Sequence, residues 1–338
     1  MPDMSVRRRA APRRAFVFGG GGVLGFAWIV GALTALQNEL GIHPGPDDLV
    51  VGTSAGAVVA GLLGCGVDID SIRRHQLGMP LPEDPPISWN YDLDSGGALP
   101  PRPGWRPGSP RLLWSALRRH DEVSRIVALS GLLPRGRGNL LPIHRMLDSV
   151  VAEVIPDQDW PDRRTWVVAV DYDSGRRVVF GRDGDPSAQL ADAVCASCSI
   201  PAWYQPVEID GHPYIDGGTI SNTSLDVVPA EEVDEVYVLA PMAALAPDSP
   251  RSPVAMVERR VRRAITRGIV HDADELRAAG VKVMLLTPGS EDLATMGANL
   301  MNPRRRTEVL NTALRTAAAE IRLQLLEPPA GLPEVDTA

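Results

Sequence analysis

The sequence predicts an α/β sandwich built around a mixed β-sheet. Residues 15–18 form a short apolar run closed by glycines, and residues 26–40 form a long apolar segment that ends at Gly41. This order indicates a strand, a glycine loop and a helix. Residues 48–51 and 55–63 repeat it, so the two pairs predict a parallel β-α-β-α unit with its loops at the carboxyl ends of the strands.

Later segments add hairpins to this parallel unit. Residues 166–171 and 177–180 alternate β-branched and polar residues on either side of a turn, and residues 207–209 and 213–215 repeat that pattern around a second turn. The sequence also predicts strands at residues 235–239 and 281–286, and helices at residues 111–129, 141–154, 254–279 and 304–326. The apolar faces of the first two of these helices fit either a hydrophobic channel or ordinary core packing.

Three segments differ in composition from the predicted domain, which covers residues 15–327. Residues 1–14 form a basic tail with five arginines, which we expect to be flexible, and residues 328–338 form a C-terminal tail. Residues 79–110 are rich in proline and glycine and predict an inserted loop. Such a loop can be a lid over a binding site or a surface excursion.

Composition excludes some classes of function. The net charge of -8 argues against nucleic acid as a partner, because a phosphate backbone rewards clustered positive charge. Three cysteines cannot form an even disulfide framework, which favours a reducing, cytoplasmic setting. Cys195 and Cys198 form a C-x-x-C, but no second ligand pair lies nearby, so we expect no metal site.

The N-terminal region has two interpretations. Arg13 and Arg14 precede an uncharged run at residues 16–36, which resembles an export signal and is long enough to span a membrane. The glycines in this run favour a buried strand, a tight loop and a core helix. Contact with a membrane surface remains a hypothesis that rests on the basic tail and on the arginine cluster at residues 259–267.

The strongest motif is a G-x-S-x-G at residues 52–56, between one apolar strand and one apolar helix. This context is the one that a nucleophile elbow requires. Its glycines permit a cramped turn, Ser54 stands at the apex, and the N-terminus of the following helix favours developing negative charge. Ser54 is therefore the candidate nucleophile.

A second glycine motif, at residues 20–25, satisfies G-x-G-x-x-G after a strand. A dinucleotide site needs an acidic residue at the end of the second strand, but Asp47 and Asp48 lie before that strand. The alternative is an oxyanion hole, in which backbone amides approach a tetrahedral intermediate. Both glycine motifs would then lie at one edge of the sheet.

The group that activates Ser54 is less obvious from local pattern. Asp216 and His271 follow Ser54 in the order of an α/β-hydrolase triad, but only one strand precedes the elbow and His271 falls in a helical stretch. Asp216-Gly217-Gly218 follows a strand and forms a sharp turn. Beside a serine elbow, this turn offers a general base that needs no imidazole.

Four motifs in order, between residues 16 and 229, resemble those of the patatin-like phospholipase family. They are the glycine-rich loop at residues 20–25, the elbow at residues 52–56, an alanine-serine block followed by proline at residues 196–201, and the aspartate motif at residues 216–218. The third motif contains both neighbouring cysteines and accounts for them without a metal.

The resemblance implies a patatin-like three-layer α/β/α sandwich with a central mixed, largely parallel sheet. It implies that Ser54 attacks an acyl carbonyl, that Asp216 is the general base, and that water releases the acyl-enzyme without a cofactor or metal. The implied oxyanion-hole residues are Gly20, Gly21 and Gly22, and the other motif residues are Gly25, Gly52, Gly56, Gly217 and Gly218. The family usually has arginine or lysine where this chain has Leu24, which leaves the headgroup preference open.

The expected activity is hydrolysis of carboxylic esters in phospholipids, lysophospholipids or glycerides, as in an enzyme of the phospholipase A or lysophospholipase type. Expected partners are the lipid or ester substrate and, peripherally, a membrane. A soluble carboxylesterase and a non-catalytic lipid-binding module that retains the fold are the alternatives. A preference for long acyl chains separates the first alternative from a lipase, and the presence of both Ser54 and Asp216 argues against the second.

Overall fold

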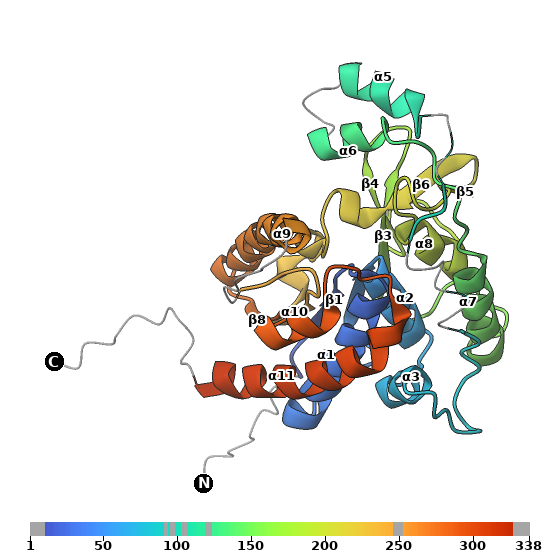
Figure 1. The fold of residues 1–338 in the computed structure, drawn as a ribbon. Coiled ribbons are helices and arrows are strands. Elements are labelled where there is room, and N and C mark those ends of the chain that lie inside the picture. The colour runs from blue at the N-terminus through green and yellow to red at the C-terminus, as the bar shows by residue number, and fades with distance from the viewer. Residues whose placement is uncertain are drawn as a thin grey trace, which may run out of the picture.

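The computed structural model describes residues 11–90, 94, 99–102, 104, 107–118, 124–245 and 253–326. An eight-stranded mixed sheet forms its centre, with the parallel order β3-β2-β1-β7-β8 and with β4, β5 and β6 joined by antiparallel pairing on the β3 side (Figure 1). The strands are β1 Arg14–Phe18, β2 Leu49–Thr53, β3 Thr165–Asp171, β4 Arg177–Phe180, β5 Val207–Ile209, β6 His212–Asp216, β7 Glu235–Leu239 and β8 Lys282–Leu286.

Helices cover both faces of this sheet. The α-helices are α1 Gly22–Leu40, α2 Ala55–Gly64, α3 Ile69–Gln76, α5 Pro110–Arg118, α6 Arg125–Ser130, α7 Leu141–Val154, α8 Leu190–Ser197, α9 Pro253–Ala278, α10 Ser290–Met296 and α11 Arg306–Leu326. Short 3-10 helices are η1 Gly217–Thr219, η2 Leu225–Val227, η3 Ala230–Glu232 and η4 Pro303–Arg305. The result is the predicted three-layer α/β/α sandwich with a largely parallel sheet.

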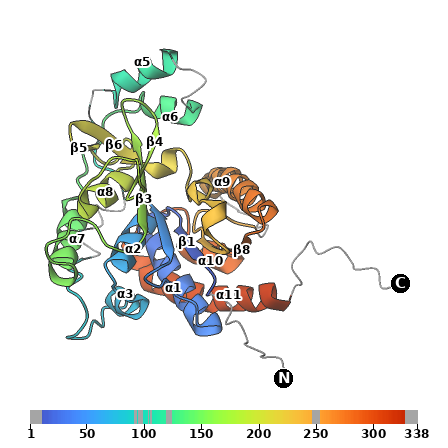
Figure 2. The ribbon, with the colours of Figure 1, turned by 180° about the vertical axis from the view of Figure 1, so that it is seen from behind.

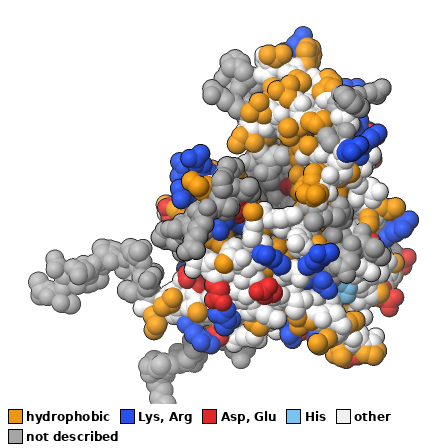
Figure 3. Space-filling model, viewed as in Figure 1, with side chains coloured by type: hydrophobic (Ala, Val, Ile, Leu, Met, Phe, Trp, Pro, Cys, Tyr) orange, Lys and Arg blue, Asp and Glu red, His pale blue; other side chains and the backbone are white. Residues whose placement is uncertain are grey.

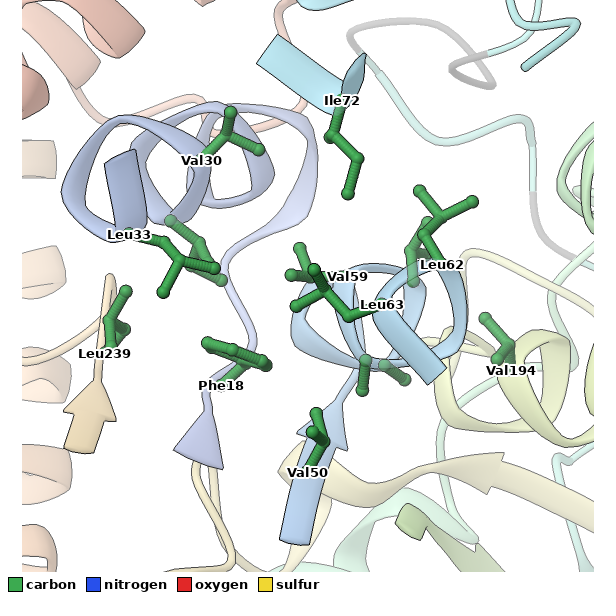
Figure 4. Packing of buried hydrophobic residues seen from close by; sticks show 14 of the residues in the cluster. Phe18, Val30, Leu33, Val50, Val59, Leu62, Leu63, Ile72, Val194 and Leu239 are labelled. Carbon is green, nitrogen blue, oxygen red and sulfur yellow. The ribbon is translucent and has the colours of Figure 1, made fainter. Parts of the chain in front are cut away.

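Side-chain alternation along β1 separates two hydrophobic cores. Phe16 and Phe18 face the layer that contains α1, α2 and α11, whereas Ala15 and Val17 face α9. Figure 4 shows side chains of α1, including Leu33, and of α2 gathered around Phe18. Seen from behind, α9 lies across the sheet from α1 and α2 (Figure 2). Each fully buried large side chain contributes about 1.5–3 kcal/mol to this packing.

The pairing of β3 brings the ends of two other strands together. Val167 and Val168 pair with both β2 and β4, so β2 and β4 occupy opposite edges of β3. Ala169 and Val170 pair with both β4 and β6, so β6 lies on the same edge as β2. The two strands run towards each other along that edge, and their carboxyl ends therefore meet over Val168 and Ala169.

Most predicted elements are confirmed, but β1 begins at Arg14, inside the predicted tail, and the bounds of three helices were wrong. Helix α1 begins at Gly22 rather than four residues later, because the Gly25 amide already bonds to the carbonyl of Gly21. The predicted helix at residues 111–129 is two helices, α5 and α6, with residues 119–123 outside the described residues. The last helix begins at Arg306, after the turn of η4.

Three short helices were not predicted. They are α3, α8 and α10, none longer than eight residues. Helix α3 is polar, and its start depends on the Asp68 side chain, which accepts a hydrogen bond from the Ser71 amide at 2.8 Å. So short a segment carries little periodicity, and packing against α1 fixes it instead.

The inserted loop and the two tails fall partly or wholly outside the described residues. Residues 79–90 contain neither helix nor strand, whereas most of residues 91–106, and residues 1–10 and 327–338, are not described. The proposal of a lid at residues 79–110 therefore stays a prediction. Helix α1 is long and apolar enough to cross a membrane, but 67% of its apolar window is buried within the fold, which agrees with the core-helix interpretation.

The arginine cluster at residues 259–267 is only partly a basic surface, because Arg260, Arg263 and Arg267 are exposed. Arg259 and Arg262 are buried, and both form ion pairs with Glu258. The Arg262 guanidinium also donates to the carbonyls of Pro241 and Ala243, so it ties α9 to the segment after β7. Membrane contact through the exposed arginines stays a prediction.

Candidate active site

Ser54 occupies a strained turn between β2 and α2. Its φ of 55° and ψ of -121° lie outside the conformations that a serine ordinarily adopts, and its side chain is buried except for 7% of its surface. The turn is tight because Gly52 and Gly56 pack against neighbouring backbone. A side chain at Gly56 would collide with the carbonyl of Phe18. This geometry is that of a nucleophile elbow.

Ser197 ties the elbow to the sheet, which sequence reasoning did not foresee. Its hydroxyl accepts a hydrogen bond from the Ser54 amide at 2.9 Å and donates to the carbonyl of Val168 at 2.6 Å. Ser197 is fully buried at the end of α8, inside the alanine-serine motif that the sequence singled out. Its position in that motif was the only feature of the sequence that could have indicated this role.

Asp216 meets Ser54 where β2 and β6 converge. The Ser54 side chain interacts with the carboxylate of Asp216, a residue that is only 6% exposed. The Gly218 amide donates to the same carboxylate at 2.7 Å, and Gly217 packs against the carbonyl of Val168. Burial raises the pKa of Asp216 to about 6, although the interactions with Ser54 and with the Gly218 amide oppose this shift.

The glycine loop lies against the elbow, on the side away from Asp216's strand. A side chain at Gly20 would lie 3.1 Å from the Ser54 β-carbon. The Gly20 amide donates to the carbonyl of Asn222 at 2.9 Å, so it is already engaged within the protein. Among the described residues, none accepts a hydrogen bond from the amides of Gly21 and Gly22, which begin α1.

The anchoring role of Asn222 was also missed. Its backbone carbonyl holds the glycine loop from the segment that follows the aspartate motif, and only the tertiary contact identifies it. Leu24, at the position where the family usually has a cation, is fully buried in the core of α1. Gly25 bonds to Gly21 and packs against Pro241, which closes the first turn of that helix.

An apolar cavity opens beside Ser54. The empty space in it, which is open to solvent, is about 810 Å³. Helices α1, α2, α3 and α7 and the end of α8 supply most of its walls. Residues that line it include Phe26, Ser54, Val58, Leu62, Ile72, Leu140, Ile143, Met146 and Ile200. The apolar face of α7 therefore lines a cavity, as one of the two sequence interpretations proposed.

The structure does not place His271 in the site. Its side chain is 72% exposed on α9 and pairs with Glu275 in the same helix at 3.5 Å. His75 does line the cavity, but its ring bonds to the carbonyl of Ile87, and burial lowers its pKa. Of these groups, Asp216 is the one whose side chain interacts with that of Ser54.

The cysteines are buried free thiols, and burial raises the pKa of Cys65 to about 12. Cys195 and Cys198 lie in and just after α8. Within the part of the chain that the structure describes, no group of three or more histidine, cysteine or acidic side chains is arranged to hold a metal ion.

The chain is similar to known proteins in its sequence family and in its fold. A family model described as patatin-like phospholipase matches residues 16–229. The search of curated proteins finds no match. VipD from Legionella pneumophila is similar in structure, with 15% identity, a TM-score of 0.43, and coverage of 94% of this chain and 67% of that one. The ExoU-SpcU complex of the Pseudomonas aeruginosa type III secretion system gives 16% identity, a TM-score of 0.32, and coverage of 93% and 60%.

Proposed function

Because the chain belongs to the patatin-like phospholipase family, we propose that it hydrolyses carboxylic esters of phospholipids, lysophospholipids or glycerides through a Ser54-Asp216 dyad. One observation supports this proposal most directly. The pairing of β3 brings the buried Asp216 to Ser54, whose side chain interacts with the Asp216 carboxylate, and Ser54 lines an apolar cavity. A nucleophile, a base and a lipid-compatible pocket thus occur together.

In the proposed acylation step, Asp216 accepts the proton of Ser54 while the serine oxygen attacks the acyl carbon. The oxyanion forms beside the N-terminus of α1, where the amides of Gly21 and Gly22 are placed to donate to it. When the intermediate collapses, the bond between the acyl carbon and the alcohol oxygen breaks. Asp216 returns its proton to the leaving alkoxide, and an acyl-serine ester remains.

In deacylation, water replaces the serine as the nucleophile. Asp216 accepts a proton from a water molecule while the oxygen of that water attacks the acyl-serine carbonyl. The second intermediate collapses to a free fatty acid, and the proton returns to the Ser54 oxygen. Asp216 must be ionised at the start of each half-reaction, and a pKa of about 6 satisfies this requirement at neutral pH.

The shape of the cavity favours a long acyl chain over a short one. Along α2, lining residues run from Ala55, next to the nucleophile, to Leu62. At 1.5 Å per residue, this stretch is about 10 Å long. Each methylene that enters such an apolar wall gains about 0.8 kcal/mol, so affinity should rise with chain length until the cavity is full.

The test uses p-nitrophenyl esters of short and long acyl chains, in the presence of a chelator. We expect Ser54→Ala and Asp216→Asn to lower kcat/KM by about 10³-fold or more, because each removes one half of a unit that acts together. His271→Ala is the matched control on an exposed helix and should keep wild-type activity.

The outcomes separate the alternatives. Loss of activity in His271→Ala would contradict the dyad and favour a triad. A preference for acetyl over long-chain esters would favour a soluble carboxylesterase. No activity in the wild-type protein, with intact folding and retained lipid binding, would favour a non-catalytic lipid-binding module.

A further inference from the structure

Helices α5 and α6 and the turn after them expose a large apolar surface. We call it the α5–α6 face, and its members are between 43% and 82% exposed. They are Trp114, Leu117, Ile126, Leu129, Leu132 and Leu133. Figure 3 shows hydrophobic side chains gathered over the part of the molecule that carries these helices. Apolar patches of this kind on a protein surface commonly mark a site of interaction.

The opposite side of the same helices is already packed. Leu112 of α5 and Val127 of α6 are buried with Val170, Tyr172 and Ile215 in a separate small core. The Tyr172 hydroxyl donates to the carbonyl of Ser130 at 2.8 Å and holds the end of α6. The helices are therefore seated on β3 and β6, and the exposed residues are a second apolar face rather than a displaced core.

Several arginines lie on or next to the face, although the chain has a net charge of -8. The described ones are Arg111, Arg118, Arg135 and Arg137. Arg111 forms an ion pair with Asp173, and Arg135 with Glu208. The guanidinium of Arg118 stacks on the ring of Trp114 at 3.7 Å.

We propose that the α5–α6 face docks on an anionic lipid bilayer, an inference that rests on the proposed function. Exposed leucines with a tryptophan and arginines are what an interfacial segment needs, because the leucines enter the acyl boundary while the cations remain among the headgroups. A lipid substrate resides in such a surface. This shared location favours a bilayer over a protein partner as the occupant of the face.

The position of the face suits this role. Figures 1 and 2 both show α5 and α6 projecting at one end of the molecule, beyond β4 and β6. Ile215, which packs beneath the face, immediately precedes Asp216 in β6. Docking would therefore hold the membrane near the strand that carries the proposed base.

Vesicle sedimentation tests the proposal in a Ser54→Ala background, so that the readout does not depend on hydrolysis. Binding of the double variant Leu117→Glu/Leu129→Glu is compared with binding of the parent protein. The vesicles contain phosphatidylcholine, either alone or mixed with phosphatidylserine. The matched control is Leu323→Glu/Leu325→Glu, which changes two leucines of α11 that are 58% and 59% exposed. We expect the first pair to lower the partition coefficient at least tenfold and the control to leave it unchanged.

A charge variant tests whether the arginines bind anionic headgroups. Arg118→Gln/Arg137→Gln should remove most of the preference for phosphatidylserine-containing vesicles, with little effect on phosphatidylcholine alone. Equal binding by wild type and Leu117→Glu/Leu129→Glu would overturn the proposal. A change from dimer to monomer on size exclusion, with unchanged vesicle binding, would overturn it too and assign the face to a second copy of the chain.

Folding and the proposed function are checked separately. With Ser54 intact, both leucine pairs should hydrolyse p-nitrophenyl butyrate at the wild-type rate and melt at the wild-type temperature. Absence of this hydrolysis in wild type would contradict the proposed function, whereas the vesicle measurement would still decide the docking face.

Discussion

Asp216 shows how one residue can favour function and oppose stability. Its carboxylate is buried, accepts a hydrogen bond from the Gly218 amide and interacts with the Ser54 side chain. These interactions favour the ionised form, but the effect of desolvation is larger and raises the pKa from 3.8 to about 6. A base with such a pKa is still ionised at neutral pH and accepts a proton more readily than an exposed aspartate.

Activity should follow the titration of this group. Below about pH 6, kcat/KM is expected to fall about tenfold per pH unit, and above it to level off, because only ionised Asp216 can accept the serine proton. Stopped assays of one soluble ester across pH 4 to 9 measure the profile. A flat profile through pH 6 would contradict the assignment of Asp216 as the base.

Stability should move in the opposite direction. The folded-state pKa is raised, so the native state holds this proton more tightly than the unfolded chain, and stability is lost as the pH rises from 3.8 through about 6. A shift of about two units corresponds to about 3 kcal/mol at high pH. Asp216→Asn should therefore be inactive yet more stable than wild type at pH 8. At pH 5 its advantage in the free energy of unfolding should be smaller by about 1 kcal/mol.

Urea unfolding of wild type and Asp216→Asn at both pH values measures this difference. Glu208→Gln is the control, because it removes a carboxylate whose side chain is 67% exposed on β5. A destabilised Asp216→Asn at pH 8 would show that the hydrogen bonds outweigh desolvation.

At the scale of elements, the elbow depends on how closely α2 approaches β1. Gly56 lies in the first turn of α2, with its backbone against the carbonyl of Phe18. This approach lets the N-terminus of the helix lie behind Ser54, where its amides favour negative charge. Gly61, in the next turns of the same helix, has ordinary space, since a side chain there would first meet Val194 at 3.4 Å.

The two glycines should respond differently to the same change. Gly56→Ala is expected to destabilise the protein by about 3 kcal/mol or more and to abolish activity, because the new methyl group forces α2 away from β1. Gly61→Ala should be neutral or stabilise by up to about 1 kcal/mol through helix propensity. Thermal unfolding and ester hydrolysis measure both effects. Similar melting temperatures for the two variants would contradict the close approach.

At the scale of the whole molecule, the fold extends beyond the region that the family model matches. That region ends at residue 229, before β7. Yet β7 pairs with β1 along all five residues, and β8 pairs with β7. Helix α11 packs along α1 on the same side as the site. The last third of the chain therefore supplies central parts of the sheet and the core.

A chain that ends at residue 229 should not fold. It lacks β7, so β1 would present an unpaired apolar edge, and it lacks α11, so one side of α1 would be exposed. We expect it to be insoluble or to lack a cooperative unfolding transition by circular dichroism. A chain that ends at Leu326 keeps every described element and serves as the control. Cooperative unfolding of the shorter chain would show that residues 16–229 form an independent unit.

Local sequence patterns determined the elements that have strong periodicity. Strands β1 and β2, both hairpins and the bounds of α7 followed from apolar runs and turn residues, and the elbow followed from its glycines. The short helices α3, α8 and α10 did not, because eight residues or fewer carry too little pattern.

The sequence by itself therefore predicted the fold class and singled out Ser54 as the candidate nucleophile and Asp216 as a candidate base. Only the tertiary structure decided how they meet: β2 and β6 share one edge of β3, and this pairing joins Ser54 to Asp216 across the chain. It also decided that Arg262 is buried and that Leu117 is exposed. The reason is that strand pairing and burial depend on contacts between distant segments, which a local pattern does not specify.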